Sequence, residues 1–170
     1  MNYPKVNLRA IEPEDLDILY AIENNIDLWD VGNANVPYSH YALRDYIAHT
    51  SSDIYSDKQV RLMIDNEYGE TVGIIDIINF DPQHLRAELG IVIQRVYRER
   101  GYGHAAIKNV LFYARCILHL HQLYVLVDEN NLNSISLFEN MGFINHSLVL
   151  KDWLFDGASY HNALILQILI

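Results

Sequence analysis

The 170-residue sequence has too few of several residue types to belong to some large classes of protein. Its single cysteine, Cys116, excludes a disulfide framework and indicates a reducing compartment. Only 20% of the residues are charged and 51% are hydrophobic, which excludes a disordered chain and predicts one domain over residues 1–170. No apolar run approaches the length of a membrane span, so no membrane association is expected.

Basic residues are also scarce: 12 lysines and arginines face 22 carboxylates, giving a formal charge of −10. Seven acidic residues and no basic one lie between Glu12 and Asp30. Such a charge disfavours nucleic acid and attracts a small cationic molecule, although an acidic surface also serves solubility. The first six residues contain no apolar region typical of a signal peptide, so a cytoplasmic location is expected.

The hydrophobic pattern predicts an α/β protein with one mixed central sheet and helices on both faces. The run at 122–128 is apolar and β-branched, which predicts a strand buried on both faces and parallel to its neighbour. The expected order is β-α-α-β-β-β-α-β-α-β-β. The strands are expected at 6–10, 59–66, 71–80, 86–94, 122–128, 143–155 and 159–170. Two helices are expected at 11–24 and 39–50, a third includes 107–117, and a fourth begins at an Asn131 or Asn133 cap and ends at Gly142.

The stretch at 94–108 contains the strongest chemical signal. Three arginines, Arg95, Arg98 and Arg100, precede two glycines, Gly101 and Gly103, and an amphipathic helix follows. Glycine allows a tight turn in which several backbone N–H groups point at one anion. A helix N-terminus adds unpaired donors and the positive end of its dipole. The stretch therefore predicts a binding loop for a pyrophosphate.

A nicotinamide dinucleotide is one possible source of that pyrophosphate. Gly101-x-Gly103-x-x-Ala106 matches the dinucleotide fingerprint, and Asp128 ends the next apolar run about twenty residues beyond it. Two features disfavour this interpretation. Seven residues, 94–100, separate the apolar run that ends at Ile93 from the first glycine, and no second βαβ half follows.

Arg98-x-x-Gly101-x-Gly103 also resembles the Q/R-x-x-G-x-G/A loop of the GCN5-related N-acetyltransferases (GNATs), and the predicted element order resembles theirs. A second resemblance is to their N-x-x-[SA]-[IL]-x-[LF]-Y-x-[KR]-x-G-F segment, matched here by Asn131, Ser134, Ile135, Leu137, Gly142 and Phe143. The resemblance implies a GNAT fold and acetyl-coenzyme A as cosubstrate. The residues that it implies for binding the coenzyme are Ile91, Val92, Ile93, Arg98, Arg100, Gly101, Tyr102, Gly103, His104, Asn131 and Phe138.

Two positions bear on the catalytic mechanism that this resemblance implies. Glu88 lies in an otherwise apolar strand, where relatives use a glutamate as the base that accepts the amine's proton. The competing explanation is an ion pair with Arg86, two residues away on the same strand face. Phe138 stands where the family has the tyrosine that protonates the thiolate, and phenylalanine has no proton to give.

Several shorter segments resemble the bacterial spermidine/diamine N-acetyltransferases. They include Arg86-Ala-Glu-Leu and the segment from Asp156-Gly157 to Ala163. This resemblance implies N-acetylation of a small polyamine-like amine, with Trp29 and Asp30 as candidates to line the acceptor pocket. Acetylation of a protein N-terminus, as in the ribosomal-protein acetyltransferases, stays open. An acyl-coenzyme A-binding module with little catalysis also stays open, because of Phe138.

Two further features yield weaker expectations. His119-x-His121 has no nearby cysteine or third ligand, so these histidines are more typical of a surface than of a metal site, and no metal is expected. The apolar strand predicted at the C-terminus makes a homodimer plausible, although it also suits a core strand.

Overall fold

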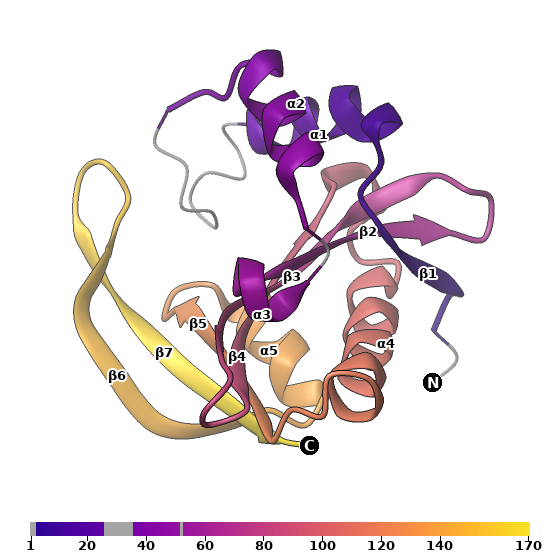
Figure 1. Cartoon of the computed structure of the whole chain (residues 1–170). Helices are drawn as coiled ribbons and strands as arrows, with labels where there is room; N and C mark the ends of the chain where they lie inside the picture. The colour runs from indigo at the N-terminus through magenta and orange to yellow at the C-terminus, as the bar shows by residue number, and fades with distance from the viewer. Residues whose placement is uncertain (1–2, 26–35, 52) are drawn as a thin grey trace.

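The computed structural model describes residues 3–25, 36–51 and 53–170. Among these residues there are seven strands and five α-helices (Figure 1). They follow the predicted order, except that one of the five helices, a short one before the second strand, was not predicted. The strands are β1 (Val6–Ala10), β2 (Val60–Asn66), β3 (Thr71–Asp81), β4 (Arg86–Ile93), β5 (Gln122–Asp128), β6 (Ile144–Phe155) and β7 (Tyr160–Leu169). The helices are α1 (Leu16–Glu23), α2 (His40–His49), α3 (Ile54–Asp57), α4 (Tyr102–Cys116) and α5 (Leu132–Asn140), with 3-10 turns at Pro13–Asp15 and Arg95–Tyr97.

The strands form one seven-stranded mixed sheet in the order β1-β2-β3-β4-β5-β7-β6. Every neighbouring pair is antiparallel except β4 and β5, which run parallel. The helix α4 connects these two parallel strands, as a crossover between parallel strands requires. The predicted mixed sheet is therefore confirmed, and its one parallel seam lies near the middle.

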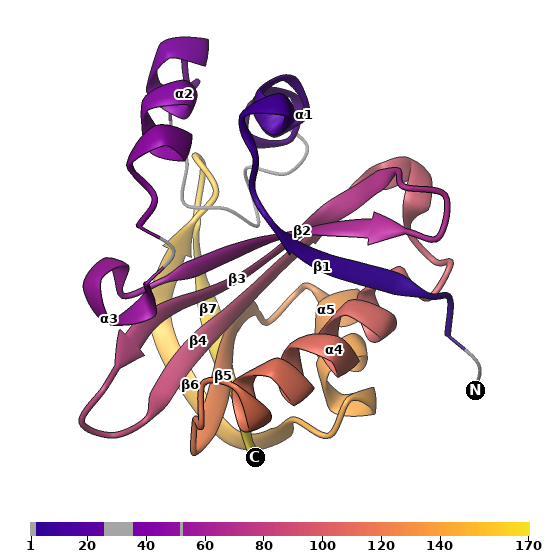
Figure 2. The ribbon, with the colours of Figure 1, turned by 45° about the vertical axis from the view of Figure 1, so that its right-hand side comes forward.

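Helices cover both faces of the sheet (Figure 2). The helices α4 and α5 lie on one face, over the larger hydrophobic core. Ile107, Val110 and Ala114 on α4 have no exposed surface, as their helical spacing predicts. The helices α1 and α2 cover part of the other face, where Leu19 and Leu43 join a smaller cluster with strand residues.

Three local features differ from the sequence-based expectations. The first turn of the predicted N-terminal helix is a 3-10 turn with Pro13 at its start, and α1 follows it. The short helix α3 was not predicted; the side chain of Asp53 caps it by accepting a hydrogen bond from the Tyr55 N–H. The third difference is in β5, whose residues are alternately buried and half-buried. The expectation of burial on both faces was therefore wrong, because little covers the face that carries Tyr124.

The described residues contain no helix that is both long and apolar enough to cross a membrane.

Candidate functional site

The parallel seam between β4 and β5 is short. The strands pair at only three positions, and the last pair joins Glu88 with Tyr124. Beyond it, the paired residues of β4 up to Ile93 contact β3, and those of β5 up to Asp128 contact β7. Two strands that separate in this way leave edge N–H and C=O groups facing the opening. An extended amide-containing ligand, such as a pantetheine arm, can bond to such edges.

The predicted pyrophosphate loop begins where β4 ends. Its first residue, Gln94, is fixed to β3: its backbone N–H donates to the carbonyl of Val72 and its side-chain amide to that of Thr71, at 2.9 and 2.6 Å. The Arg98 Nε donates back to the carbonyl of Ile93 at 3.0 Å, which folds the loop onto the strand end. The guanidinium of Arg100 lies 6.0 Å from the centre of the Tyr97 ring. The loop thus holds two arginines beside the start of a helix.

Gly101 and Gly103 are both needed by the backbone here, for different reasons. Gly101 precedes α4 with φ of +85°, and a Cβ there would lie 3.0 Å from Pro4 Cδ. Gly103 is helical, and a Cβ there would lie 3.3 Å from a methyl of Leu137 on α5 and 3.9 Å from Ile93. Gly103 therefore lets the start of α4 approach both α5 and the end of β4. The free N–H groups of the 15-residue helix α4 face the loop at this point.

The aromatic residues of the loop pack against their neighbours. Tyr102 meets Tyr97 edge-to-face with ring centres 6.0 Å apart, and His104 stacks on Tyr3 at 4.9 Å. These contacts connect the loop to the N-terminal segment that leads into β1. Binding of the coenzyme by Tyr102 and His104 stays a prediction, as it does for the arginines and glycines.

Glu88 lies at the point where the seam opens. One oxygen of its carboxylate accepts a hydrogen bond from the side-chain amide of Asn79, at 2.9 Å. Arg86 instead donates to Asp81 on β3 at 3.1 Å. The competing explanation of Glu88, an ion pair with Arg86, is therefore wrong. Catalysis by Glu88 stays a prediction, with the carboxylate half-buried and its main hydrogen bond coming from a neutral amide.

Glu88 points to the face of the sheet that α1 and α2 cover. Val92, four residues further along β4, packs against the α1–α2 cluster, and alternate residues of a strand share a face. Gly90 lies between them on that face and contributes no side chain. Among the described residues, the nearest atom to a Cβ at Gly90 would be Asp76 Cβ of β3, at 3.9 Å. Gly90 therefore leaves β4 without a side chain between Glu88 and Val92 on this face.

An ion network borders this surface. Arg61 on β2 donates twice to Asp76 at 2.8 Å and once to Glu23 of α1 at 2.5 Å. Burial lowers the pKa of Arg61, but the negative charge and hydrogen bonds of Asp76 more than offset this and raise it. Tyr46 of α2 lies under the guanidinium, with the ring centre 5.6 Å away. The network fastens α1 to the sheet.

Tyr124 is the residue at this site that the sequence analysis did not single out. It is half-buried and shares the face of Glu88, its partner across the seam. Burial raises the pKa of the Tyr124 hydroxyl most, and the charge and a hydrogen bond of the Glu88 carboxylate raise it further. The sequence offered no signal for this contact, because the register between β4 and β5 decides which residue faces Glu88.

Phe138 lies on α5 and Asn131 directly precedes it, on the face of the sheet opposite Glu88 (Figure 2). The ring of Phe138 is 4% exposed and packs edge-to-face on Phe143, with ring centres 5.2 Å apart. The side chain of Asn131 accepts a hydrogen bond from the Ser134 N–H at 3.1 Å, which confirms it as the cap of α5. Their contacts with the coenzyme stay predictions. Trp29 and Asp30, predicted to line the acceptor pocket, lie outside the described residues.

A second cluster of titratable groups lies where the β6–β7 hairpin meets the end of β5. The two ring nitrogens of His161 lie 2.8 Å from the carboxylate of Asp128 and 3.0 Å from that of Asp156. The hydrogen bond to Asp128 is the main cause that raises the pKa of His161. A cavity of about 270 Å³ beside it is lined by Asp128, Asn130, Asn131, Leu154, Phe155, Asp156 and His161.

The part of the chain that the structure describes contains no recognisable metal site. No group of three or more histidine, cysteine, aspartate or glutamate side chains is arranged there to hold an ion. His119 and His121 are exposed.

The fold and the seam are those of an acetyltransferase. A family model described as an acetyltransferase (GNAT) domain matches residues 5–144. The chain therefore belongs to the GNAT acetyltransferases and is an N-acetyltransferase, and enzymes of this family use acetyl-coenzyme A. The family predicted from the glycine loop and the Asn131 segment is confirmed.

Comparison with individual proteins shows which members of the family this chain resembles. The chain is 28% identical over 161 residues to the spermidine N(1)-acetyltransferase of Escherichia coli K12, covering 94% of this chain and 83% of the relative. The crystal structure of the Vibrio cholerae spermidine N-acetyltransferase with CoA and spermine matches with a TM-score of 0.87 and 25% identity, covering 96% and 95% of the two chains. A dodecameric structure of the Vibrio cholerae enzyme matches with a TM-score of 0.80 and 25% identity, over 96% and 93% of the chains.

Proposed function

We propose that this protein transfers the acetyl group of acetyl-coenzyme A to a primary amine of a small cationic acceptor, a polyamine or diamine. The observation that carries the proposal is the seam, where β4 and β5 stop pairing at Glu88. From Glu88, β4 continues for five residues to Ile93, about 16 Å at roughly 3.3 Å per residue, and the pyrophosphate loop begins at the next residue, Gln94. A pantetheine arm that lies along β4 from this loop would extend towards Glu88.

The residues of the loop fit the proposed cosubstrate. Arg98 and Arg100 would neutralise phosphate charge, and the backbone N–H groups between Gly101 and His104 would bond to phosphate oxygens. The edge of Ile91, Val92 and Ile93 would bond to the amides of the arm. Asn131 would contact the same arm from the start of α5, and Phe138 would pack beside it.

The charge of the opposite face favours a cationic acceptor. Glu88, Glu23 and Asp76 contribute three carboxylates there, and Arg61 donates to two of them. The sequence from Glu12 to Asp30, which includes α1, adds further acidic residues. We propose that Trp29 and Asp30 belong to this acceptor site. Some of the relatives that match over nearly the whole chain are spermidine N-acetyltransferases, which supports the polyamine class.

Glu88 is the proposed base. An ammonium must lose a proton before its nitrogen can attack the thioester, and a carboxylate at the end of the seam can accept it directly or through water. The amide of Asn79 fixes one carboxylate oxygen and leaves the other for the proton.

A panel of acceptors tests the proposal. Release of the coenzyme A thiol would be followed with acetyl-coenzyme A and spermine, spermidine, putrescine, single amino acids or a short peptide. A strong response to one polyamine is expected. A response confined to the peptide would favour a protein N-terminal acetyltransferase. No response, with coenzyme A still bound by calorimetry, would favour the acyl-coenzyme A-binding module.

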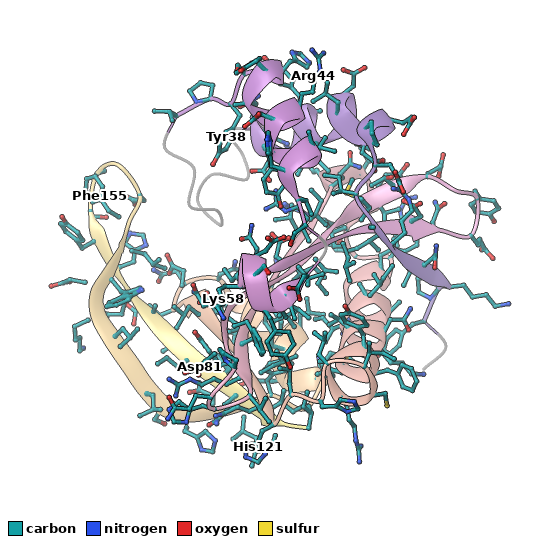
Figure 3. All side chains as sticks on the ribbon, viewed as in Figure 1. Tyr38, Arg44, Lys58, Asp81, His121 and Phe155 are labelled. Atoms are coloured by element: carbon teal, nitrogen blue, oxygen red, sulfur yellow. The ribbon has the colours of Figure 1, made fainter. Side chains whose placement is uncertain are left out.

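We propose a second copy of the chain as the protein's partner. The β6–β7 hairpin exposes several large apolar side chains: Leu148, Val149, Trp153, Phe155 and Tyr160. Phe155 lies near the tip of this hairpin (Figure 3). Exposed apolar groups of this size mark association surfaces. The match to a dodecameric Vibrio cholerae enzyme supports self-association, and sedimentation of the purified protein measures it.

A further inference from the structure

Transfer of an acetyl group from a thioester requires a proton for the departing sulfur as well as a base for the nitrogen. Phe138 cannot give this proton, and its ring is buried against Phe143. The donor must therefore be sought among the groups that line the opened seam. Only groups that can lose a proton and regain it within one turnover qualify.

Tyr124 meets these conditions. It is the residue of β5 in register with Glu88, at the last pair before the strands separate. The two side chains emerge on the same face of the sheet, where burial and then the negative charge of Glu88 raise the pKa of the Tyr124 hydroxyl. Because its pKa lies above the ordinary value of about 10, the hydroxyl keeps its proton at neutral pH.

We propose that Tyr124 and Glu88 form a proton-transfer pair, in which Tyr124 protonates the departing thiolate and Glu88 takes the proton of the attacking amine. This inference rests on the proposed acetyl transfer to an amine. It adds Tyr124 as a catalytic residue and connects the acid to the base across the last residue pair of the seam.

The protons balance over one turnover. The acceptor ammonium first loses one proton to solvent through Glu88 and becomes a free amine. Its nitrogen then forms the C–N bond with the acetyl carbonyl, and the C–S electron pair leaves on sulfur. The second nitrogen proton passes to Glu88, and the phenolic proton of Tyr124 passes to sulfur. Tyr124 then regains a proton from Glu88, so both groups end as they began and one proton is released in total.

The neighbours of the pair allow this transfer. Asn79 donates to one oxygen of Glu88, so the carboxylate is held without a compensating positive charge. Arg86 is nearby and lowers the pKa of Tyr124, but its guanidinium is engaged with Asp81 at 3.1 Å. The negative charge of Glu88 outweighs the opposing charge of Arg86 at the Tyr124 hydroxyl.

The test compares Tyr124→Phe with Tyr113→Phe. Both substitutions remove the hydroxyl of a half-buried tyrosine, but burial alone raises the pKa of Tyr113, on α4. With the best acceptor of the panel, Tyr124→Phe is expected to lower kcat by roughly 100-fold, the scale of one general acid, with KM for acetyl-coenzyme A unchanged. Tyr113→Phe is expected to keep the wild-type kcat.

A titration without substrate gives an independent measurement. The ultraviolet absorbance of tyrosinate is followed with pH in the wild type and Tyr124→Phe, and the difference is the titration of Tyr124. In Glu88→Gln the same difference, taken against Glu88→Gln/Tyr124→Phe, is expected at lower pH, because the charge that opposes ionisation is gone.

The outcomes separate the two proposals. If the wild type acetylates no amine, the proposed function fails, and the proton-transfer pair fails with it as a catalytic device. If the wild type is active but Tyr124→Phe keeps its kcat, the pair is overturned while the function stands. An unchanged Tyr124 titration in Glu88→Gln also overturns it, because the two groups then do not interact.

Discussion

Arg61 is expected to be a main electrostatic support of the face beside Glu88, and its replacement tests this. The substitution Arg61→Met keeps much of the side-chain volume and removes the charge. It leaves Asp76 and Glu23 facing each other with side chains that are only 22% and 19% exposed. Removing one partner of a buried ion pair costs about 3–5 kcal/mol. Partial exposure lowers this, so a loss of about 2–3 kcal/mol in the free energy of unfolding is expected.

Urea unfolding followed by circular dichroism measures this loss, and thermal unfolding is expected to shift by roughly 5–10 °C for a chain of this size. The matched control is Arg86→Met, since the Arg86 side chain is 48% exposed and pairs with Asp81 at 3.1 Å. The control is expected to cost about 0–1 kcal/mol. If Arg61→Met costs no more than Arg86→Met, the network does not stabilise this face and the reasoning is refuted.

Two further predictions concern the loop and the hairpin. Gly103→Val would press a branched side chain against Leu137 and Ile93, so the affinity for coenzyme A, measured by calorimetry, is expected to fall at least about tenfold. Gly103→Ala is expected to have an affinity between those of the wild type and Gly103→Val. Unchanged affinity in Gly103→Val would contradict the pyrophosphate assignment. His161 has a raised pKa, so its stabilisation is complete below its ordinary pKa of about 6.5 and is lost as pH rises through the folded value. The pKa of Asp128 is lowered, so its contribution is lost only as pH falls through the lowered value, below about pH 4. The melting temperature of His161→Gln should therefore lie further below the wild type at pH 6 than at pH 8.5, and an equal difference would show that the imidazolium charge contributes nothing.

The sequence predicted those parts of the fold that local patterns determine. The helical spacing of Ile107, Val110 and Ala114 identified the buried stripe of α4, because one helix face must be apolar to pack on a sheet. Asn131 and Asn133 could be named as candidate caps because capping depends on the few residues that follow the cap, and the structure shows that Asn131 is the cap. The family could be predicted because the glycine loop and the α5 segment are both contiguous in sequence.

Contacts between distant residues could not be predicted in the same way. Whether Glu88 pairs with Arg86 or bonds to Asn79 depends on the bend at Asn79, whose φ is +53°. The position of Tyr124 opposite Glu88 depends on the register of the seam, to which the thirty-five intervening residues contribute no pattern. The cluster around His161 depends in turn on how the last hairpin folds back over the end of β5. Such arrangements follow from packing of the whole chain.

The strand β6 ends the sheet, and its shape limits how chains can aggregate. An edge strand of 12 residues with exposed apolar side chains could template the addition of further strands. Its pairing with β7 shifts register between Asn145 and Leu148 and again between Leu150 and Leu154. Ser147 and Asp152, within these shifts, have φ values of +60° and +47°. Irregularities of this kind interrupt the row of edge N–H and C=O groups, so a stray strand cannot extend the ladder. Association would then proceed through side chains, which favours closed assemblies over fibres.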